Sequence, residues 1–248
     1  MRTLKDILIE KLSLDDINFD TLDEKLKKKY NLVYNPITNC YDCEGNIQVL
    51  DDLIKDGCFI CDFGVVKGYF YCSYLDSLKS LKGAPKKVDG DFDCSDCNKL
   101  KSLEGAPEEV GMGFYCRDCK NLESLKGAPK KVVGNFTCCY CNKLKSLKST
   151  LEELGGDFSC WKCENLESLE GAPREIGRSF DCSDCKKLKS LKGAPKKVGR
   201  HFTCSNCENL QSLEGAPEEI GGDFYCYNCL KLKDYNISNT KLREKLVK

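Results

Sequence analysis

Hydrophobic residues recur at a spacing of 22 along most of the chain, in a unit that reads F-x-C-x-x-C-x-x-L-x-S-L-x-G-A-P-x-x-V-G-x-x. Leu75 stands where the second cysteine column would begin. A regular array of this kind predicts stacked copies of one small unit. Three columns keep the spacing without insertion: Phe70, Phe92, Phe114, Phe136, Phe158, Phe180, Phe202 and Phe224; Cys72, Cys94, Cys116, Cys138, Cys160, Cys182, Cys204 and Cys226; and Cys97, Cys119, Cys141, Cys163, Cys185, Cys207 and Cys229.

Within one unit, the apolar pattern predicts a short strand, a turn and a return. Phe92 and Cys94 alternate at period two, which places both side chains on one face of a strand. Leu100 and Leu103 lie three residues apart, a spacing typical of a helical or 3₁₀ turn. The Gly-Ala-Pro sequence then interrupts regular structure, because glycine allows unusual dihedrals and proline lacks an N–H donor. Val110 closes the unit on the far side.

The length of the unit decides between repeat architectures. A two-helix repeat needs about 34 residues, whereas 22 residues suffice for one strand and a short return. A single coil has nothing to bury its apolar face against, but stacked coils share one continuous core. The sequence therefore predicts a repeat solenoid with a parallel β-sheet over residues 58–235, containing eight strands in phase and closed by helical caps.

The F-x-C-x-x-C-x-x-L-x-S-L run resembles the strand-and-turn segment of cysteine-containing leucine-rich repeats over roughly residues 59–236. The G-A-P-x-x-V-G tail is similar to repeat arrays in proteins of bacteriophages and of their bacterial hosts. The resemblance implies a curved solenoid with a parallel sheet on its concave face, and a protein-binding role. In this chain phenylalanine replaces the aliphatic residue at the strand start, and the convex side is very short. A horseshoe and a closed parallel β-helix are therefore both open.

Residues 1–57 do not repeat and are expected to form an N-terminal cap, helical with a small hairpin. A second helix is expected to be capped by Asp20 or Thr21 and to reach Lys29, and residues 32–41 suggest the hairpin. The first helix is predicted from four residues that share one helical face: Leu4, Ile7, Leu8 and Leu12.

Two further segments border the array. Residues 58–69 are expected to form a short first coil, in which Phe59 and Cys61 take the strand positions. In residues 236–248, Leu242 and Leu246 lie four apart and predict a C-terminal capping helix.

Charged residues alternate in sign from coil to coil at two repeat positions. Like charges on adjacent coils, about 5 Å apart, would repel by somewhat under ~1 kcal/mol even in water, and alternation turns this into weak attraction. It also balances 39 basic against 39 acidic residues, which argues against binding nucleic acid through a basic surface. The alternating sets are Lys86-Lys87, Glu108-Glu109, Lys130-Lys131, Glu152-Glu153, Arg174-Glu175, Lys196-Lys197 and Glu218-Glu219, and Lys82, Glu104, Lys126, Lys148, Glu170, Lys192 and Glu214.

Cysteine is unusually frequent, at 20 of 248 residues. The chain shows no apolar stretch long enough for a signal peptide or a membrane span, which favours a reducing, cytoplasmic location, in the host cytoplasm or on a virion if the chain is phage-encoded. The cysteine columns are then interpreted as small buried hydrophobic residues, with metal and disulfides as alternatives. The strongest zinc candidate lies outside the array, where Cys40-x-x-Cys43 and Cys58-x-x-Cys61 are separated by 14 residues.

Catalytic chemistry finds little support in the sequence. His201, the one histidine, stands at a repeat position held elsewhere by other residue types, and no base-and-nucleophile pair recurs around it. Cys139 follows the inward Cys138 and is expected to point outward, as the most plausible exposed thiol. We therefore expect no enzymatic activity, no cofactor, and no nucleic-acid or membrane partner.

The variable positions of the repeat flank the inward phenylalanine and cysteine on the outer side of the strand. Trp, Tyr and Arg carry much of the binding energy at protein interfaces. The sequence predicts a non-enzymatic module that presents a rigid surface to a protein partner of unknown identity. The alternatives are a structural or assembly component of a phage particle, with self-association possible, and a metal-thiolate protein. The candidate binding residues are Tyr115, Arg117, Tyr140, Trp161, Lys162, Tyr225 and Tyr227.

Overall fold

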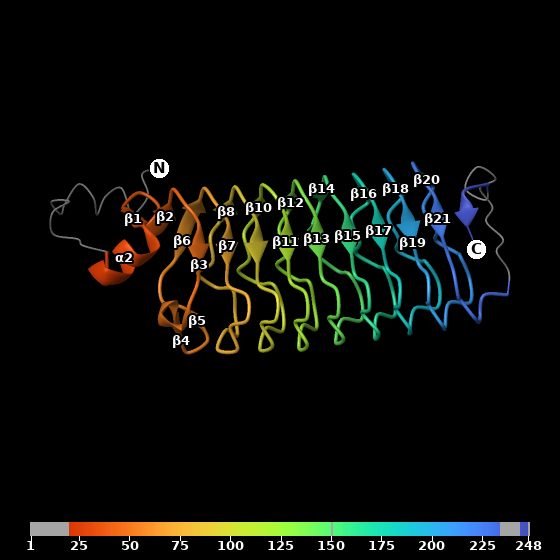
Figure 1. Cartoon of the computed structure of the whole chain (residues 1–248), viewed down its shortest axis with the longest axis horizontal. Helices are drawn as coiled ribbons and strands as arrows, with labels where there is room; N and C mark the ends of the chain where they lie inside the picture. Colours follow the sequence, from red (N-terminus) through yellow and green to blue (C-terminus); the bar gives the residue numbers. More distant parts are fainter. Residues whose placement is uncertain (1–19, 150, 234–243, 248) are drawn as a thin grey trace, which may run out of the picture.

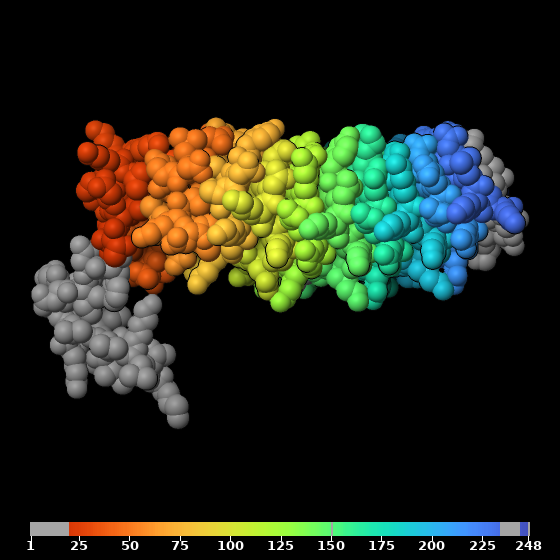
Figure 2. Space-filling model, turned by 90° about the horizontal axis from the view of Figure 1, so that it is seen from below, coloured from red at the N-terminus to blue at the C-terminus, as the bar shows by residue number. Residues whose placement is uncertain are grey.

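The protein is a nearly straight column of stacked coils, shown here as a computed structural model that describes residues 20–149, 151–233 and 244–247 (Figure 1). The space-filling view shows the described part of the chain as a rod of even width (Figure 2). Consecutive coils pair through parallel strands in register. The predicted parallel-stranded repeat solenoid is therefore confirmed.

Ten short strands form one parallel sheet, which we call the phenylalanine ladder. Its register sets each phenylalanine beside the one 22 residues further on, as Phe92 beside Phe114 and Phe114 beside Phe136. The strands are β3 (Ile47–Gln48), β7 (Phe70–Tyr71), β9 (Phe92–Asp93), β11 (Phe114–Tyr115), β13 (Phe136–Thr137), β15 (Phe158–Ser159), β17 (Phe180–Asp181), β19 (Phe202–Thr203), β21 (Phe224–Tyr225) and β22 (Leu246–Val247).

A second set of parallel strands forms what we call the valine ladder. In each coil, its strand comes just before the strand of the phenylalanine ladder, and a short turn joins the two. Each coil therefore has parallel strands on two sides, as in a β-helix. The strands are β2 (Cys40–Cys43), β6 (Phe63–Val66), β8 (Lys87–Val88), β10 (Glu109–Val110), β12 (Lys131–Val132) and β14 (Glu153–Leu154), followed by a separate sheet of β16 (Glu175–Ile176), β18 (Lys197–Val198) and β20 (Glu219–Ile220).

The core is a stack of phenylalanine rings flanked by cysteines and leucines. From Phe70 to Phe202, successive rings are nearly parallel, with centroids 5.1 to 5.6 Å apart. Each buried phenylalanine stabilises the fold by roughly 1.5–3 kcal/mol through the loss of apolar surface. The Leu100 N–H donates to the Cys97 carbonyl, so the predicted 3₁₀-type turn carries the leucines into this core.

The glycine of the Gly-Ala-Pro turn is required by its backbone conformation. Gly127 has φ of 85°, and a Cβ there would lie 2.5 Å from the Glu104 Cα of the preceding coil. A larger residue would both strain the turn and push the coils apart.

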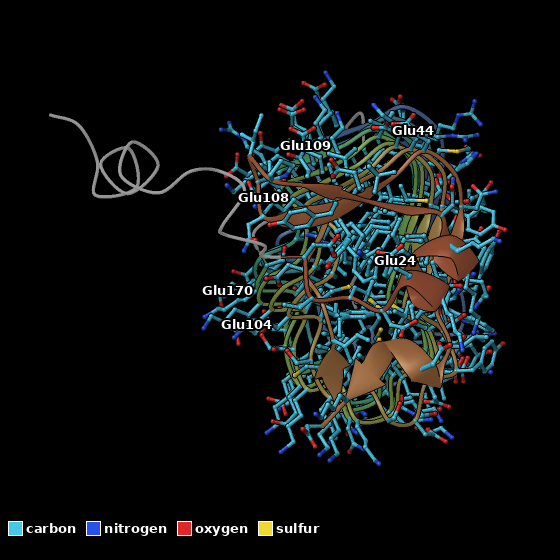
Figure 3. All side chains as sticks on the ribbon, turned by 90° about the vertical axis from the view of Figure 1, so that its left-hand side faces the viewer. Glu24, Glu44, Glu104, Glu108, Glu109 and Glu170 are labelled. Atoms are coloured by element: carbon cyan, nitrogen blue, oxygen red, sulfur yellow. The ribbon has the colours of Figure 1, made fainter. Side chains whose placement is uncertain are left out.

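The alternation of charges produces ion pairs between adjacent coils, as predicted. On the valine-ladder side, Lys130 pairs with Glu108 at 3.3 Å and Lys196 with Glu218 at 2.6 Å. After the leucines, Lys126 pairs with Glu104 at 2.7 Å. Viewed along the column, Glu104, Glu108, Glu109 and Glu170 all point away from the core (Figure 3).

The valine ladder is interrupted between β14 and β16. At this point the charge alternation slips, because Glu153 is followed by Glu175, and the Gly-Ala-Pro turn is replaced by a sequence that begins at Ser149. A shallow hollow of about 630 Å³ lies over the interruption, with Leu154 and Ile176 in its lining.

The N-terminal end departs from the sequence interpretation in detail. Helix α2 (Glu24–Tyr30) is capped by the Asp23 side chain, not by Asp20 or Thr21. Strand β1 (Leu32–Asn35) forms an antiparallel hairpin with β2, but β2 and β3 already pair with the next coil, so the ladders begin before residue 58. The predicted helix over residues 4–12 lies outside the described residues.

Two further segments also differ from expectation. Phe59 does not occupy a strand of the phenylalanine ladder, because β4 (Ile54–Lys55) and β5 (Cys58–Phe59) form an antiparallel hairpin after the 3₁₀ helix η2 (Asp51–Leu53). The prediction of a C-terminal helix is wrong for Leu246 and Val247. These two residues form β22, which pairs in parallel with β21 and buries apolar surface against the last coil. The rest of that predicted helix, residues 236–243, lies outside the described residues.

Candidate functional site

The outer side of the phenylalanine ladder, together with the corner that follows it, forms a surface that we call the aromatic face. Each coil contributes the residue before the phenylalanine, the residue after it, and the two residues after the first cysteine. Every tyrosine and tryptophan between residues 69 and 233 lies on this face: Tyr69, Tyr71, Tyr74, Tyr115, Tyr140, Trp161, Tyr225 and Tyr227.

Three of the predicted binding residues form a central patch, which we define as Tyr140, Trp161 and Lys162. The Tyr140 ring lies edge-on to the Trp161 ring, with centroids 5.0 Å apart. The Lys162 Nζ lies 4.7 Å from the Trp161 ring centroid and 5.4 Å from that of Tyr140. The Trp161 Nε1–H donates to Asp184 Oδ2 at 2.8 Å, which fixes the indole. Asp184 was missed from the sequence, although it stands 22 residues after Lys162.

Arg117 and Tyr115 lie beside the central patch. The Arg117 guanidinium lies 5.0 Å from the centroid of the Tyr115 ring. Arg117 and Trp161 occupy the same repeat position two coils apart, and Cys139 stands between them. The structure therefore brings five of the seven predicted residues into one region.

Tyr225 and Tyr227 form a separate cluster three coils further on. Their rings stack with centroids 6.0 Å apart, and the Tyr225 hydroxyl donates to Asp223 Oδ2 at 2.9 Å. A similar pair that the sequence analysis did not single out, Tyr69 and Tyr71, stacks at 4.1 Å near the other end.

The second residue after each first cysteine adopts a left-handed conformation, with φ between 52° and 62°. Asparagine and aspartate tolerate this region better than other non-glycine residues, and five of the eight positions use them. Tyr74, Tyr140 and Lys162 are the exceptions. A bulky residue in this conformation costs on the order of 1 kcal/mol. The other five positions are Asp96, Asp118, Asp184, Asn206 and Asn228.

The aromatic face carries an excess of carboxylates. It holds eight aspartates, against Arg117 and Lys162 as its permanently charged cations. Several of them also support the backbone: Asp91 Oδ1 accepts the Gly113 N–H at 2.7 Å, and Asp157 Oδ1 accepts the Ser179 N–H at 2.8 Å. The aspartates are Asp91, Asp93, Asp96, Asp118, Asp157, Asp181, Asp184 and Asp223.

His201 belongs to the same set of backbone supports. Its Nδ1 accepts the Asp223 N–H at 3.0 Å, as a side chain at this repeat position does in other coils. The imidazole therefore replaces a carboxylate or amide oxygen in a structural contact.

The expectation that Cys139 is an exposed thiol is wrong. Its side chain is only 6% exposed, and its Sγ lies 3.1 Å from the Ser159 Oγ. Burial raises the pKa of the Cys139 thiol to about 11. Adjacent coils also enclose Ser95, Ser183 and Ser205, which hold the same repeat position.

The second cysteine of each coil supplies a hydrogen bond as well as apolar volume. The Cys119 thiol donates to the Cys94 carbonyl at 3.2 Å, and Cys141 repeats this with Cys116 at 3.1 Å. The Cys94 carbonyl does not receive the Arg117 N–H of the next coil, because that N–H donates to the Ser95 hydroxyl instead. Burial raises the pKa of the Cys141 thiol, which keeps it protonated and able to donate.

The structure does not gather the zinc candidate, Cys40, Cys43, Cys58 and Cys61, into one metal site among the described residues. Cys40 and Cys43 lie on β2 and donate to the carbonyls of Thr38 and Tyr30, whereas Cys58 lies in the hairpin of β4 and β5. In residues 20–149, 151–233 and 244–247, no three cysteine, histidine or acidic side chains are arranged to hold a metal ion.

Comparisons of the chain with protein-family models, with curated proteins and with solved structures found no significant match. Among the helices of the described segments, none has the length and apolarity needed to cross a bilayer.

Proposed function

We propose that this chain is a non-enzymatic binding module that presents its aromatic face to another protein. The observation that carries the proposal is the segregation of side-chain types around the column. The tyrosines and the tryptophan of the array occupy one side, whereas the valine-ladder side carries lysines and glutamates that pair with each other. Residues of the types that contribute most to interface energy are thus gathered where a partner could reach them together.

The support beneath this face suits binding. Each strand is hydrogen-bonded to the coils on both sides, and the stacked phenylalanines fill the space behind it. Trp161 is additionally held by Asp184. Side chains that are already ordered lose less conformational entropy when a partner binds.

Backbone strain at the central patch favours the same interpretation. Tyr140 and Lys162 occupy left-handed positions that aspartate or asparagine fill in neighbouring coils. The chain therefore forgoes stability where its aromatic residues gather, and strain of this kind clusters at functional sites. A protein-binding role is also what the resemblance to cysteine-containing leucine-rich repeats implies.

The test replaces the central patch with residues that other coils already use. Tyr140→Asn and Trp161→Ser introduce the residue types of Asn206 and Ser183. A partner captured from a lysate of the source cells by the unaltered chain would be purified, and its Kd measured by calorimetry. We expect the double variant to bind at least tenfold more weakly, while its melting temperature stays equal or rises.

A matched control carries Lys130→Ala and Lys196→Ala on the valine-ladder side, and it should bind the partner as the unaltered chain does. Equal affinity of the central-patch variant and the unaltered chain, or loss of binding in the control alone, would overturn the proposal.

A further inference from the structure

Charged side chains are arranged differently on the aromatic face and on the rest of the column. On the valine-ladder side and after the leucines, charges of opposite sign face each other and form ion pairs. On the aromatic face, none of the eight aspartates pairs with a lysine or arginine within the described residues, and one, Asp223, lies 3.6 Å from His201.

Like charges even occupy adjacent coils on this face. Asp96 and Asp118 stand at the same repeat position in neighbouring coils, and the Asp118 N–H bonds toward the next coil in the same way as the Asp96 N–H. Burial, together with the negative charge of Asp118, raises the pKa of Asp96. Lys120 and Arg117 offset part of this repulsion, but neither forms an ion pair with Asp96 or Asp118 within the described residues. These carboxylates are therefore available to a positively charged partner.

Exposed aromatic rings lie among these carboxylates. The Tyr74 ring is 77% exposed, in the coil before Asp96, and Tyr71 and Tyr115 flank Asp93 along the phenylalanine ladder. Rings of this face already accept cations within the chain, because Arg117 lies over Tyr115 and Lys162 over Trp161. An ammonium or guanidinium group is attracted both to a ring face and to a carboxylate beside it.

We propose that the partner contacts the aromatic face through a basic polypeptide segment, whose lysine and arginine side chains pair with Asp96 and Asp118 beside Tyr74. This inference rests on the proposed function and names the chemistry of the partner. Charge complementarity selects this occupant, because an acidic segment would be repelled by the same aspartates. The segment runs along the coils between Tyr71 and Tyr115.

The experiment selects peptides instead of relying on a known partner. A displayed library of random 12-residue peptides is panned against the full chain, and the affinity of the best peptide is measured by fluorescence anisotropy. We expect enrichment of lysine and arginine, and at least a tenfold loss of affinity between 50 mM and 500 mM NaCl.

Two variants that remove the same number of charges locate the contact. The double variant Asp96→Asn with Asp118→Asn should bind the selected peptide at least tenfold more weakly. It should still fold, because Asn206 and Asn228 adopt the same left-handed conformation at this repeat position. Glu108→Gln combined with Glu218→Gln removes two negative charges on the valine-ladder side, away from the aromatic face, and should leave the Kd within twofold. Circular dichroism and melting curves verify the fold of each variant.

The outcomes separate this inference from the proposed function. Neutral or acidic peptides that bind equally to the Asp96/Asp118 variant, yet lose affinity with Tyr140→Asn and Trp161→Ser, would overturn the basic partner and leave the binding function standing. If no selected peptide distinguishes the unaltered chain from either variant, both proposals fail.

Discussion

At the scale of the single residue, the cysteines of this chain solve a problem of hydrogen bonding that the tight corner creates. The Cys94 carbonyl points toward the next coil, but the N–H that would meet it is taken by the Ser95 hydroxyl. A buried carbonyl without a donor costs roughly 1–3 kcal/mol. The Cys119 thiol is small enough to fit between the phenylalanine stack and the turn, and it donates the missing bond. An aliphatic residue of similar size could fill the space but could not donate.

Substitutions at Cys119 test this dual role. Cys119→Ala should destabilise the protein by about 2 kcal/mol, because it removes both packing and the donor to Cys94, whereas Cys119→Ser keeps a donor and should cost less. Urea unfolding under reducing conditions measures both.

Cys116 provides the comparison for this prediction. Its thiol lies 3.5 Å from the Thr137 carbonyl, which already accepts the Cys116 N–H. Serine should therefore have no advantage over alanine at Cys116. Identical losses for alanine and serine at Cys119 would refute a hydrogen-bonding role for that column.

At the scale of the element, each strand of the array is only two residues long and is stable because it pairs on both sides. Ion pairs between adjacent coils reinforce this pairing at the surface, where each contributes little by itself. The valine ladder is interrupted where the alternation slips between Glu153 and Glu175, so the charge pattern and the strand pairing change together.

The contribution of the alternation can be tested at Glu218. Glu218→Lys places a lysine beside Lys196 and should lower the melting temperature by ~1–2 °C. Adding Lys196→Glu should restore it, because the new glutamate then faces both Arg174 and the new lysine. Calorimetry at low salt measures both changes, and 1 M NaCl should reduce them. A double variant that is less stable than Glu218→Lys would contradict the pairing.

The elements also show which parts of the fold the sequence can predict. The register from Phe70 to Phe224 follows from the 22-residue period, because stacked coils can bury their rings only in phase. The coil that carries Ile47 was missed, since its offset to Phe70 is 23 residues and its core residue is not phenylalanine. The valine ladder was not predicted as strands, because two residues such as Glu109 and Val110 carry no alternation to recognise.

The candidate site was predictable to a similar extent. The residues of the central patch could be identified because their positions in the repeat face outward and hold different residue types from coil to coil. Asp184 and the burial of Cys139 depend on contacts with the adjacent coil, which the sequence of a single repeat does not reveal.

At the scale of the whole molecule, the column is close to one-dimensional: each coil contacts its neighbours and little else. Stability then accumulates coil by coil, and an interface on the aromatic face can extend over several of them. The central patch lies in the coils around Phe136 and Phe158, with further coils on both sides, so the ends of the column are remote from it.

Removal of whole coils is the sharpest test of this architecture. Deletion of residues 92–113 places Phe70 next to Phe114 and keeps every column in phase, so the chain should fold to a rod shorter by about 5 Å, with a lower melting temperature. Deletion of residues 92–102 removes half a coil and should prevent cooperative folding, because the phenylalanine and cysteine columns no longer align. Circular dichroism, melting curves and small-angle scattering distinguish the two. The 22-residue deletion keeps Tyr140, Trp161 and Lys162, so binding at the central patch should survive it. Equal disruption by both deletions would show that the coils do not act as interchangeable units.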